Sequence, residues 1–340
     1  MSAMDPVVAL RRIAFLLERR LESSYRIKAY RGAADALAGL DPDDVRRLAD
    51  EGSLTRVKGV GDKTATVATE ALRTGVPAYL STLEETAGPL AEGGEVPRAA
   101  LRGDLHTHSN WTDGGSPPRE MAETCVAVGH QYAALTDHSP RLTVARGLSA
   151  ERLREQVALV GELNEELAPF RLLTGIEVDI LDDGSLDQDD DLLAALDVVV
   201  ASVHSKLAME RSAMTRRMVT AVRNPRVDVL GHCTGRLVTG GRGTRKPSQF
   251  DTDAVFAACA ESNTAVEINS RPERSDPPDE LLRLALDVGC LLSIDSDAHA
   301  PGQLDFLDHG CARADAHGVP LDRVVNAWPL DELLAWTTRS

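Results

Sequence analysis

Hydrophobic positions follow a helical period in the first part of the chain. They recur at Val7, Leu10, Ile13, Leu17 and Leu21, and this spacing predicts an amphipathic helix. Asp41 followed by Pro42 is typical of a helix start, because the aspartate can accept a free amide of the first turn and the proline needs no amide partner there. The pattern then predicts a helix over residues 43–51, followed by a glycine-containing turn and a second helix to about residue 73. Residues 5–80 are therefore predicted to be entirely helical.

The pattern changes at Leu101, where short apolar runs begin to alternate with helical patterns. The runs span residues 132–136, 172–176, 196–203, 227–231, 264–268 and 290–294. Alternation of strand and helix over such a length predicts a parallel α/β fold, a barrel of seven or eight strands. Residues 86–98 are rich in glycine, proline and alanine and show no period, which indicates a linker. We therefore expect a helical domain over 1–85, a linker over 86–99 and an α/β domain over 100–340.

Composition places the chain among globular proteins of a reducing compartment. Hydrophobic residues make up 43% of its 340 residues, and no run reaches the roughly 20 apolar residues of a membrane span. Arg and Glu interrupt the N-terminal apolar pattern, which argues against a signal peptide. The five cysteines show no CxxC spacing, so we expect reduced thiols and a cytoplasmic location, without a membrane partner. The net charge of −16 disfavours a nucleic-acid partner, but residues 1–80 are nearly neutral and the acidity belongs to the rest.

Histidines and carboxylates gather at the ends of the predicted strands. Six of the nine histidines stand there, together with three acidic residues: His106, His108, His138, His204, His232, His299, Asp137, Glu177 and Asp297. The carboxyl ends of parallel strands meet at one end of a barrel, so these side chains should lie close together. Imidazole combined with carboxylate suits Zn, Mn or Fe better than Mg or Ca. The sequence therefore predicts a metal site, and the remaining histidines, His130, His309 and His317, are given no role.

These segments carry a resemblance to a known family. The motifs GDLHTHSNWTDG, LTDHS, GIEVDI, SVHS, LGHCTGR, EINSRPER and SDAH resemble those of the PHP (polymerase and histidinol phosphatase) superfamily. The likeness is greatest to the PHP domain at the C-terminus of bacterial family X DNA polymerases and covers residues 101–337. It implies a distorted (βα)7 barrel that binds up to three divalent metal ions, which would be Zn, Mn or Fe. It also implies phosphoester hydrolysis by a metal-activated hydroxide.

The resemblance assigns ligands and catalytic residues. One ion would be held by His106, His108, Glu177 and Asp297, a second by Glu177, His204 and His232, and a third by Asp113, His138 and His299. Glu177, Asp297 and His299 would also be catalytic. Cys233 stands where relatives usually have proline, and a packed, inert thiol is expected there. Five cations are expected to contact the phosphate-containing substrate: Arg242, Arg245 and Lys246 in one loop, and Arg271 and Arg274 after the EINS segment.

The helical part carries a second resemblance. VKGVGDKTA looks like the hairpin of a helix-hairpin-helix, in which glycines allow a close turn and helix amides hold a DNA phosphate. We expect DNA contacts at Lys58, Gly59, Gly61 and Lys63. The wider stretch is similar to the small N-terminal domain of family X polymerases. Val67 replaces the Schiff-base lysine of that family's lyases, and the short linker leaves no room for a polymerase palm, so neither activity is expected.

The first functional hypothesis is a DNA-end-processing enzyme, a 3′–5′ exonuclease, a 3′-phosphatase or both. The second is a phosphatase of small molecules such as histidinol phosphate or a nucleotide. A third is a DNA-binding module without catalysis, against which the full set of ligands weighs. An amidohydrolase also begins with HxH on a barrel strand, but the SDAH segment and Asp113 fit it less well. The sequence leaves the oligomeric state open.

Overall fold

The computed structural model describes residues 3–241 and 243–338. The chain forms two compact units, Met1–Pro89 and Leu90–Ser340. The boundary between them lies inside the segment 86–99 that the sequence suggested as a linker. No helix among the described residues is both long enough and apolar enough to span a membrane.

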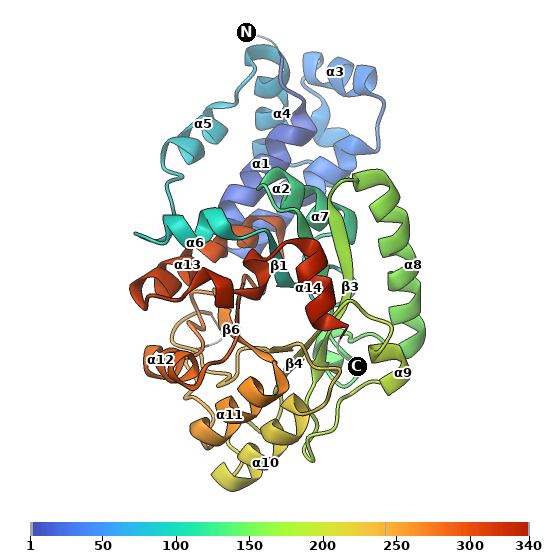
Figure 1. The fold of residues 1–340 in the computed structure, drawn as a ribbon. Helices are drawn as coiled ribbons and strands as arrows, with labels where there is room; N and C mark the ends of the chain where they lie inside the picture. Colours follow the sequence, from blue (N-terminus) through green and yellow to red (C-terminus); the bar gives the residue numbers. More distant parts are fainter. Residues whose placement is uncertain (1–2, 242, 339–340) are drawn as a thin grey trace. The chain divides into compact units, whose positions relative to one another are not determined.

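The N-terminal unit is all helical, as its periodicity predicts (Figure 1). It contains α1 (Pro6–Arg19), α2 (Ser24–Ala38), α3 (Pro42–Asp50), η1 (Leu54–Arg56), α4 (Asp62–Thr74) and α5 (Ala78–Glu85). The Asp41 side chain caps α3 by accepting the amide of Asp43 at 2.9 Å. The apolar face of α1 is buried in the core of the unit, where Leu10, Ile13 and Leu17 are fully covered. Val67 is buried in the same core.

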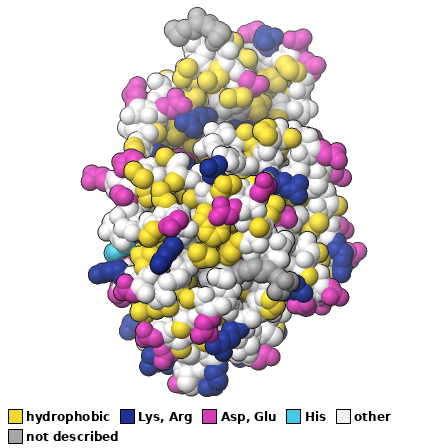
Figure 2. Space-filling view, viewed as in Figure 1, with side chains coloured by type: hydrophobic (Ala, Val, Ile, Leu, Met, Phe, Trp, Pro, Cys, Tyr) yellow, Lys and Arg dark blue, Asp and Glu magenta, His cyan; other side chains and the backbone are white. Residues whose placement is uncertain are grey.

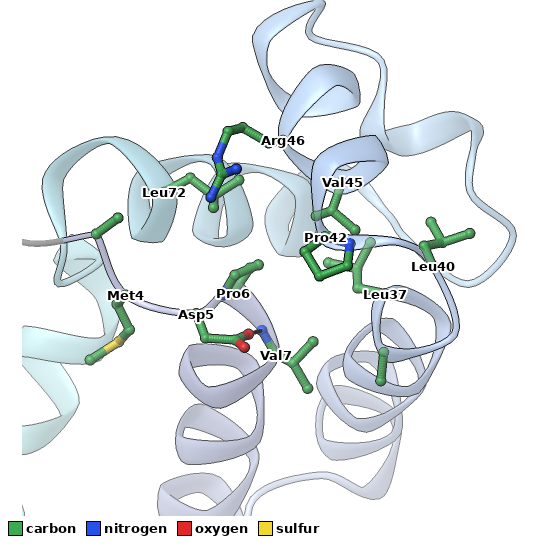
Figure 3. A pocket seen from close by; sticks show the side chains of 12 residues that line it. Met4, Asp5, Pro6, Val7, Leu37, Leu40, Pro42, Val45, Arg46 and Leu72 are labelled. Carbon is green, nitrogen blue, oxygen red and sulfur yellow. Dashed lines mark hydrogen bonds between the residues drawn. The ribbon is translucent and has the colours of Figure 1, made fainter.

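A mostly apolar hollow of about 430 Å³ lies in this unit between the start of α1 and the turn from α2 to α3 (Figure 3). Leu37, Pro42 and Val45 line it, and Asp5 and Arg46 are the charged residues of its wall. None of the residues that line it is a predicted metal ligand or belongs to the predicted hairpin. The hollow is therefore separate from the chemistry that the sequence suggests.

The C-terminal unit confirms the predicted parallel α/β fold. Its seven strands pair in chain order, each parallel to the next: β1 (Gly103–Thr107), β2 (Tyr132–Leu135), β3 (Arg171–Asp179), β4 (Val198–Ser202), β5 (Val229–Leu230), β6 (Ala265–Asn269) and β7 (Leu292–Asp295). Among the described residues, one helix precedes β1, one follows each of β1 to β6, and two follow β7: α6 (Glu95–Ala100), α7 (Pro118–Ala127), α8 (Ala150–Leu167), α9 (Asp190–Leu193), α10 (Arg211–Val222), α11 (Thr252–Ser262), α12 (Asp279–Val288), α13 (Leu307–Ala316) and α14 (Leu330–Thr337). Short turns, η2 (Thr143–Ala145), η3 (Pro301–Phe306), η4 (Leu321–Arg323) and η5 (Val325–Ala327), complete the unit.

Both faces of the sheet are buried, which explains the unbroken apolar runs in the sequence. In β4, Val198 and Val200 join an inner cluster that α14 closes with Trp336. The alternate residues Val199 and Ala201 join a second cluster, beneath the surrounding helices. A strand buried on both sides needs apolar residues at every position, so a period of two is absent.

The barrel is nearly closed, and side chains complete the seam between β1 and β7. The described strands show no continuous ladder there, only a bridge between Thr107 and Ala298. Two buried carboxylates take the place of backbone acceptors. Asp295 accepts the amide of Leu105 at 2.8 Å, and Asp104 accepts the amide of Ser296 at 3.2 Å. This seam is the distortion of the barrel.

Helix α6 is the main departure from the expected elements, because it occupies the end of the segment interpreted as a linker. It follows Gly94, whose φ of 82° lies in the left-handed region that favours glycine. The helix packs against α13, and Arg98 pairs with Asp308 at 3.4 Å. Packing against α13 stabilises this short helix, and its sequence has no hydrophobic period from which the helix could be predicted.

Candidate metal centre

The nine predicted ligands come together at the carboxyl ends of the strands. Each belongs to at least one group of side chains whose ligand atoms lie within 4.8 Å of one another: His106, His108, Asp113, His138, Glu177, His204, His232, Asp297 and His299. They come from β3 and the ends of β1, β2, β4, β5 and β7, and Asp113 comes from the loop after β1. Residues more than 190 positions apart in the chain thus meet in one place.

Glu177 is the centre of the cluster. Its Oε1 lies 2.8 Å from Nε2 of His232 and 3.1 Å from Nε2 of His204. Its Oε2 lies 2.8 Å from Nδ1 of His138 and 3.3 Å from Nε2 of His106. A carboxylate whose two oxygens face different histidines has the arrangement expected of a ligand that bridges two cations.

Asp113, His138 and His299 form an outer group. Oδ1 of Asp113 lies 3.3 Å from Nε2 of His138 and 3.5 Å from Nε2 of His299. The ring of His108 lies between the two imidazoles, with centroids 4.5 Å from His138 and 4.3 Å from His299. His108 therefore belongs to this group by distance, in addition to the group that the sequence suggested.

The inner group consists of His106, His108 and Asp297. Oδ1 of Asp297 lies 3.4 Å from Nε2 of His108 and 4.0 Å from Nε2 of His106. Asp297 has a φ of 51° and His232 a φ of 21°, a region of backbone conformation that is rare for residues with a side chain. Strain of this kind persists where surrounding contacts impose it, and it is concentrated at functional sites.

Several buried ring nitrogens of the cluster form no well-oriented hydrogen bond among the described residues, although carboxylates or other imidazoles lie close to them. The atoms are Nε2 of His106, both ring nitrogens of His108, Nδ1 of His138, Nδ1 of His204 and Nδ1 of His232. An unpaired buried polar atom costs free energy, so such a concentration needs an explanation. Nitrogen and carboxylate oxygen are the ligand atoms of Zn, Mn and Fe sites, and the residues present fit such ions.

Burial and charge shift the pKa values of the cluster strongly. Burial disfavours the charged form of Glu177, but the neighbouring His204, His106 and His138 outweigh it and hold the pKa of Glu177 well below its ordinary value. Burial would likewise lower the pKa of His138, yet Glu177 and Asp113 raise it to about 10. Burial and two neighbouring histidines, His299 and His138, lower the pKa of His108 to about 3. The cluster without metal therefore binds protons at some ring nitrogens and excludes them from others.

Three buried carboxylates support the cluster, and the sequence interpretation assigned none of them a role. Glu267 in β6 lies 2.6 Å from Nδ1 of His106. Asp179 in β3 accepts the amide of His204 at 3.1 Å. Asp137 accepts the amide of Ser109 at 2.9 Å and the Nε2 amide of Gln156 at 2.7 Å, and so holds the loop that leads to Asp113. A charged residue inside an apolar strand run, as in TAVEI, was the available signal for Glu267.

The predicted substrate-binding cations lie in two environments. Arg271 and Arg274 are buried: Arg271 donates to the carbonyl of Asp297 at 2.8 Å, and Nε of Arg274 lies 3.2 Å from Oδ2 of Asp297. Both therefore contact the predicted ligands directly. Arg245 and Lys246 are exposed at the end of a small hairpin that is closed by a bridge between Leu237 and Arg245. Arg242 lies outside the described residues.

Cys233 follows His232 but belongs to none of the groups of described side chains that could hold a metal ion. Its side chain is buried, and Sγ lies 3.8 Å from Oδ1 of Asp276. Burial and the Asp276 carboxylate raise the pKa of the Cys233 thiol well above its ordinary value. The thiolate that metal binding or oxidation requires is therefore disfavoured.

The predicted hairpin lies in the N-terminal unit between η1 and α4. Gly59 adopts a φ of 100°, where a side chain would be strained, and packs near the carbonyl of Gly32. Gly61 precedes the first turn of α4 and donates its amide to Thr64 Oγ1 at 3.0 Å. Lys58 and Lys63 are exposed on either side of this turn. The hairpin thus presents two cations beside a helix N-terminus.

Comparison with known proteins identifies both units. Residues 2–77 match the helix-hairpin-helix domain family, and residues 104–271 match the PHP domain family. The chain is 42% identical over 240 residues to the "DNA polymerase/3'-5' exonuclease PolX" of Bacillus subtilis. That match covers 71% of this chain and 41% of the relative, so the chain spans less than half of the relative's length.

Further similarities are more distant. A "probable phosphatase" of Thermoanaerobacter sp. (strain X514) is 26% identical over 236 residues, which cover 66% of this chain and 89% of that protein. Among solved structures, histidinol phosphate phosphatase of Lactococcus lactis, crystallised with zinc, L-histidinol and phosphate, is 18% identical with a TM-score of 0.47. That similarity covers 64% of this chain and 92% of the other.

Proposed function

This chain consists of a PHP domain preceded by a helix-hairpin-helix domain, and we propose that it is a metal-dependent phosphoesterase acting on the 3′ ends of DNA. The observation that carries the proposal is the position of Glu177, whose two carboxylate oxygens face ring nitrogens of four histidines: His106, His138, His204 and His232. Nine side chains in four overlapping groups lie close enough together to hold divalent ions, and the proposal assigns three ions to them. Such ions supply Lewis acidity and an activated water to phosphoester hydrolysis.

The exposure of the ligands indicates where a phosphate approaches. The side chains of Asp113, His299 and His204 are 37%, 22% and 13% exposed, whereas that of His106 is fully buried. The cluster is therefore open to solvent along the outer group. A phosphoester reaching it from that side would meet Asp113 and His299 first, and the inner group would remain shielded from water. Exclusion of water strengthens the electrostatic interactions of the inner group.

The chain's own residues would hold the predicted ligands in position. Glu177, with its low pKa, stays ionised and holds its histidines in place. Arg271 donates to the carbonyl of Asp297 at 2.8 Å, and its Nη1 lies 3.1 Å from Nδ1 of His299, so it fixes the two residues together. Nδ1 of His299 faces Arg271 and the carbonyl of Asp297, and its Nε2 faces Asp113, so this partly exposed imidazole is held in position to act as a ligand. Asp297 and Glu177 would act as ligands as well as in catalysis.

Features of the N-terminal unit support the proposal that DNA is the substrate. The helix-hairpin-helix match and the exposed Lys58 and Lys63 fit contact with a phosphate backbone. A small-molecule phosphatase is the second candidate, and the surface charge favours it. On the face shown in Figure 2, Lys and Arg side chains are interspersed with Asp and Glu, without a broad basic surface.

A substrate panel distinguishes the two candidates. Protein loaded with Mn²⁺ is offered single-stranded DNA, DNA with a 3′ phosphate, abasic DNA and histidinol phosphate, and product is measured against a metal-free control. The proposal expects removal of nucleotides or phosphate from 3′ ends. Turnover of histidinol phosphate alone would replace DNA with a small substrate, and cleavage of abasic DNA by β-elimination would contradict the expectation drawn from Val67.

A further inference from the structure

Glu267 occupies an unusual position among the buried carboxylates of the barrel. It lies in β6 and its side chain is fully buried. One carboxylate oxygen is 2.6 Å from Nδ1 of His106. The other accepts the backbone amide of His232 and the Nδ2 amide of Asn269. Glu267 therefore contacts two predicted ligands that belong to different strands.

The contact with His106 decides which ring nitrogen carries the proton. A carboxylate accepts hydrogen bonds, so Nδ1 of His106 is the donor. Its Nε2 is then available toward Glu177 Oε2, at 3.3 Å, and toward Asp297 Oδ1, at 4.0 Å. A second-layer carboxylate that fixes the tautomer of a histidine is a common feature of metal sites, and it raises the basicity of the ligand nitrogen.

The contact with His232 acts through the backbone. The amide of His232 points to Glu267 while its φ is 21°, and Nε2 of the same residue lies 2.8 Å from Glu177. The hydrogen bond thus helps to hold a backbone conformation that few side-chain-bearing residues adopt. Asn269 extends the network, because its Nδ2 also lies 3.1 Å from Oδ2 of Asp297.

We propose that Glu267 is a positioning residue. It orients the ring of His106 and the backbone of His232, so that one carboxylate fixes the positions of these two predicted ligands. This inference rests on the proposed metal-dependent function. Three donors converge on the side chain, and only an ionised carboxylate offers acceptors on both oxygens. Glutamine has the same shape but would turn an amide NH2 toward one of the donors.

The test uses the full chain and measures metal binding without any substrate. Zn²⁺ affinity is obtained by competition with a chromogenic chelator, and the melting temperature of the metal-free protein is measured in parallel. Glu267→Gln is the main variant. Asp228→Asn is the matched control, because Asp228 is a buried carboxylate of the same barrel that accepts the amide of Val199 at 2.8 Å.

Glu267→Gln is expected to lower Zn²⁺ affinity roughly 10- to 100-fold, the usual effect of losing such a partner. The metal-free melting temperature is also expected to fall, because the amide NH2 leaves one of the three donors without an acceptor, so affinity is compared at a temperature at which both proteins are folded. Asp228→Asn should keep wild-type affinity. Unchanged affinity in Glu267→Gln, or an equal loss in Asp228→Asn, would overturn the inference.

A second variant decides the matter if Glu267→Gln does not fold. Glu267→Asp keeps the charge but withdraws the carboxylate from His106 by one methylene, and the same loss of affinity is expected. Wild-type affinity in this variant would overturn the inference. Wild-type protein that binds zinc but leaves DNA ends intact would refute the proposed function alone, since none of these measurements involves DNA.

Discussion

Nε2 of His232 lies 2.8 Å from Oε1 of Glu177, although 55 residues separate the two in the chain. The contact joins the end of β5 to β3 across the mouth of the barrel. Both side chains are almost completely buried, and burial alone would make a charged carboxylate costly. The histidines around Glu177 offset this free-energy cost of burial, and cations bound between these side chains would lower it further.

Loss of a ligand should abolish hydrolysis. His204→Ala and Asp297→Ala each remove one predicted ligand, and a metal ion stabilises a phosphoryl transition state by several kcal/mol, so activity should fall about 100-fold or more. Circular dichroism should show folded protein. His317→Ala is the control, because His317 pairs with Asp279 outside the cluster. Activity within about tenfold of wild type in both cluster variants would place the site elsewhere.

Metal uptake should become more favourable as pH rises. The raised pKa of His138, about 10, means that this ring holds a proton at neutral pH in the metal-free protein. Binding must displace that proton, so apparent affinity should increase with pH up to about pH 10. Calorimetric titration in two buffers of different ionisation enthalpy measures the protons released. Binding without proton release at neutral pH would contradict this prediction.

The same pKa shifts predict opposite pH effects on the stability of the metal-free protein. The pKa of His138 is raised, so its contribution is fully present below about pH 6.5 and is lost as pH rises towards 10. The pKa of His108 is lowered to about 3, so its contribution is present above about pH 6.5 and is lost as pH falls towards 3. Urea unfolding over pH 4–9, with chelator present, should therefore show a maximum of stability between these limits. A free energy of unfolding that is independent of pH would contradict the protonation pattern.

Arg274→Ala should destabilise the protein as well as reduce activity. Arg274 Nε lies 3.2 Å from Oδ2 of Asp297, and both side chains are buried. Breaking a buried pair by removing one partner costs about 3–5 kcal/mol, and the lower end is expected because Asn269 still faces Asp297. Denaturant unfolding of metal-free protein measures the change.

Lys246→Ala, at an exposed position, should leave stability unchanged and raise KM for DNA without lowering kcat.

DNA affinity should depend on the hairpin of the N-terminal unit. Lys58→Glu combined with Lys63→Glu should weaken DNA binding and flatten its dependence on salt by roughly one unit of slope per lost contact. Hydrolysis of a small chromogenic phosphodiester should be unchanged. Arg46→Glu combined with Arg73→Glu makes the same charge change at exposed positions outside the hairpin and serves as the control. Equal DNA binding by all three proteins would favour the small-molecule phosphatase.

The sequence predicted the features that depend on local pattern. Apolar runs buried on both faces identify the strands, and histidines placed after those runs identify the cluster. It did not predict α6, whose stability comes from packing against α13. Nor did it predict that Glu267, Asp179 and Asp137 support the cluster, because their partners lie on other strands and only the closed barrel brings them together. Arg271 and Arg274 were expected to contact phosphate because they are basic and follow the EINS segment, and that stays a prediction; their contacts with Asp297 could not be predicted, because only the fold brings β6 and β7 side by side.

The most direct test follows hydrolysis and metal content together. Protein is stripped with a chelator and titrated with Mn²⁺, and phosphate release from an oligonucleotide with a 3′ phosphate is measured alongside the number of ions bound per chain. We predict no activity in the stripped protein and full activity as occupancy approaches three ions, since the nine ligands form overlapping groups around Glu177. Activity that survives complete removal of metal, or occupancy that stays at one ion or below, would contradict the account.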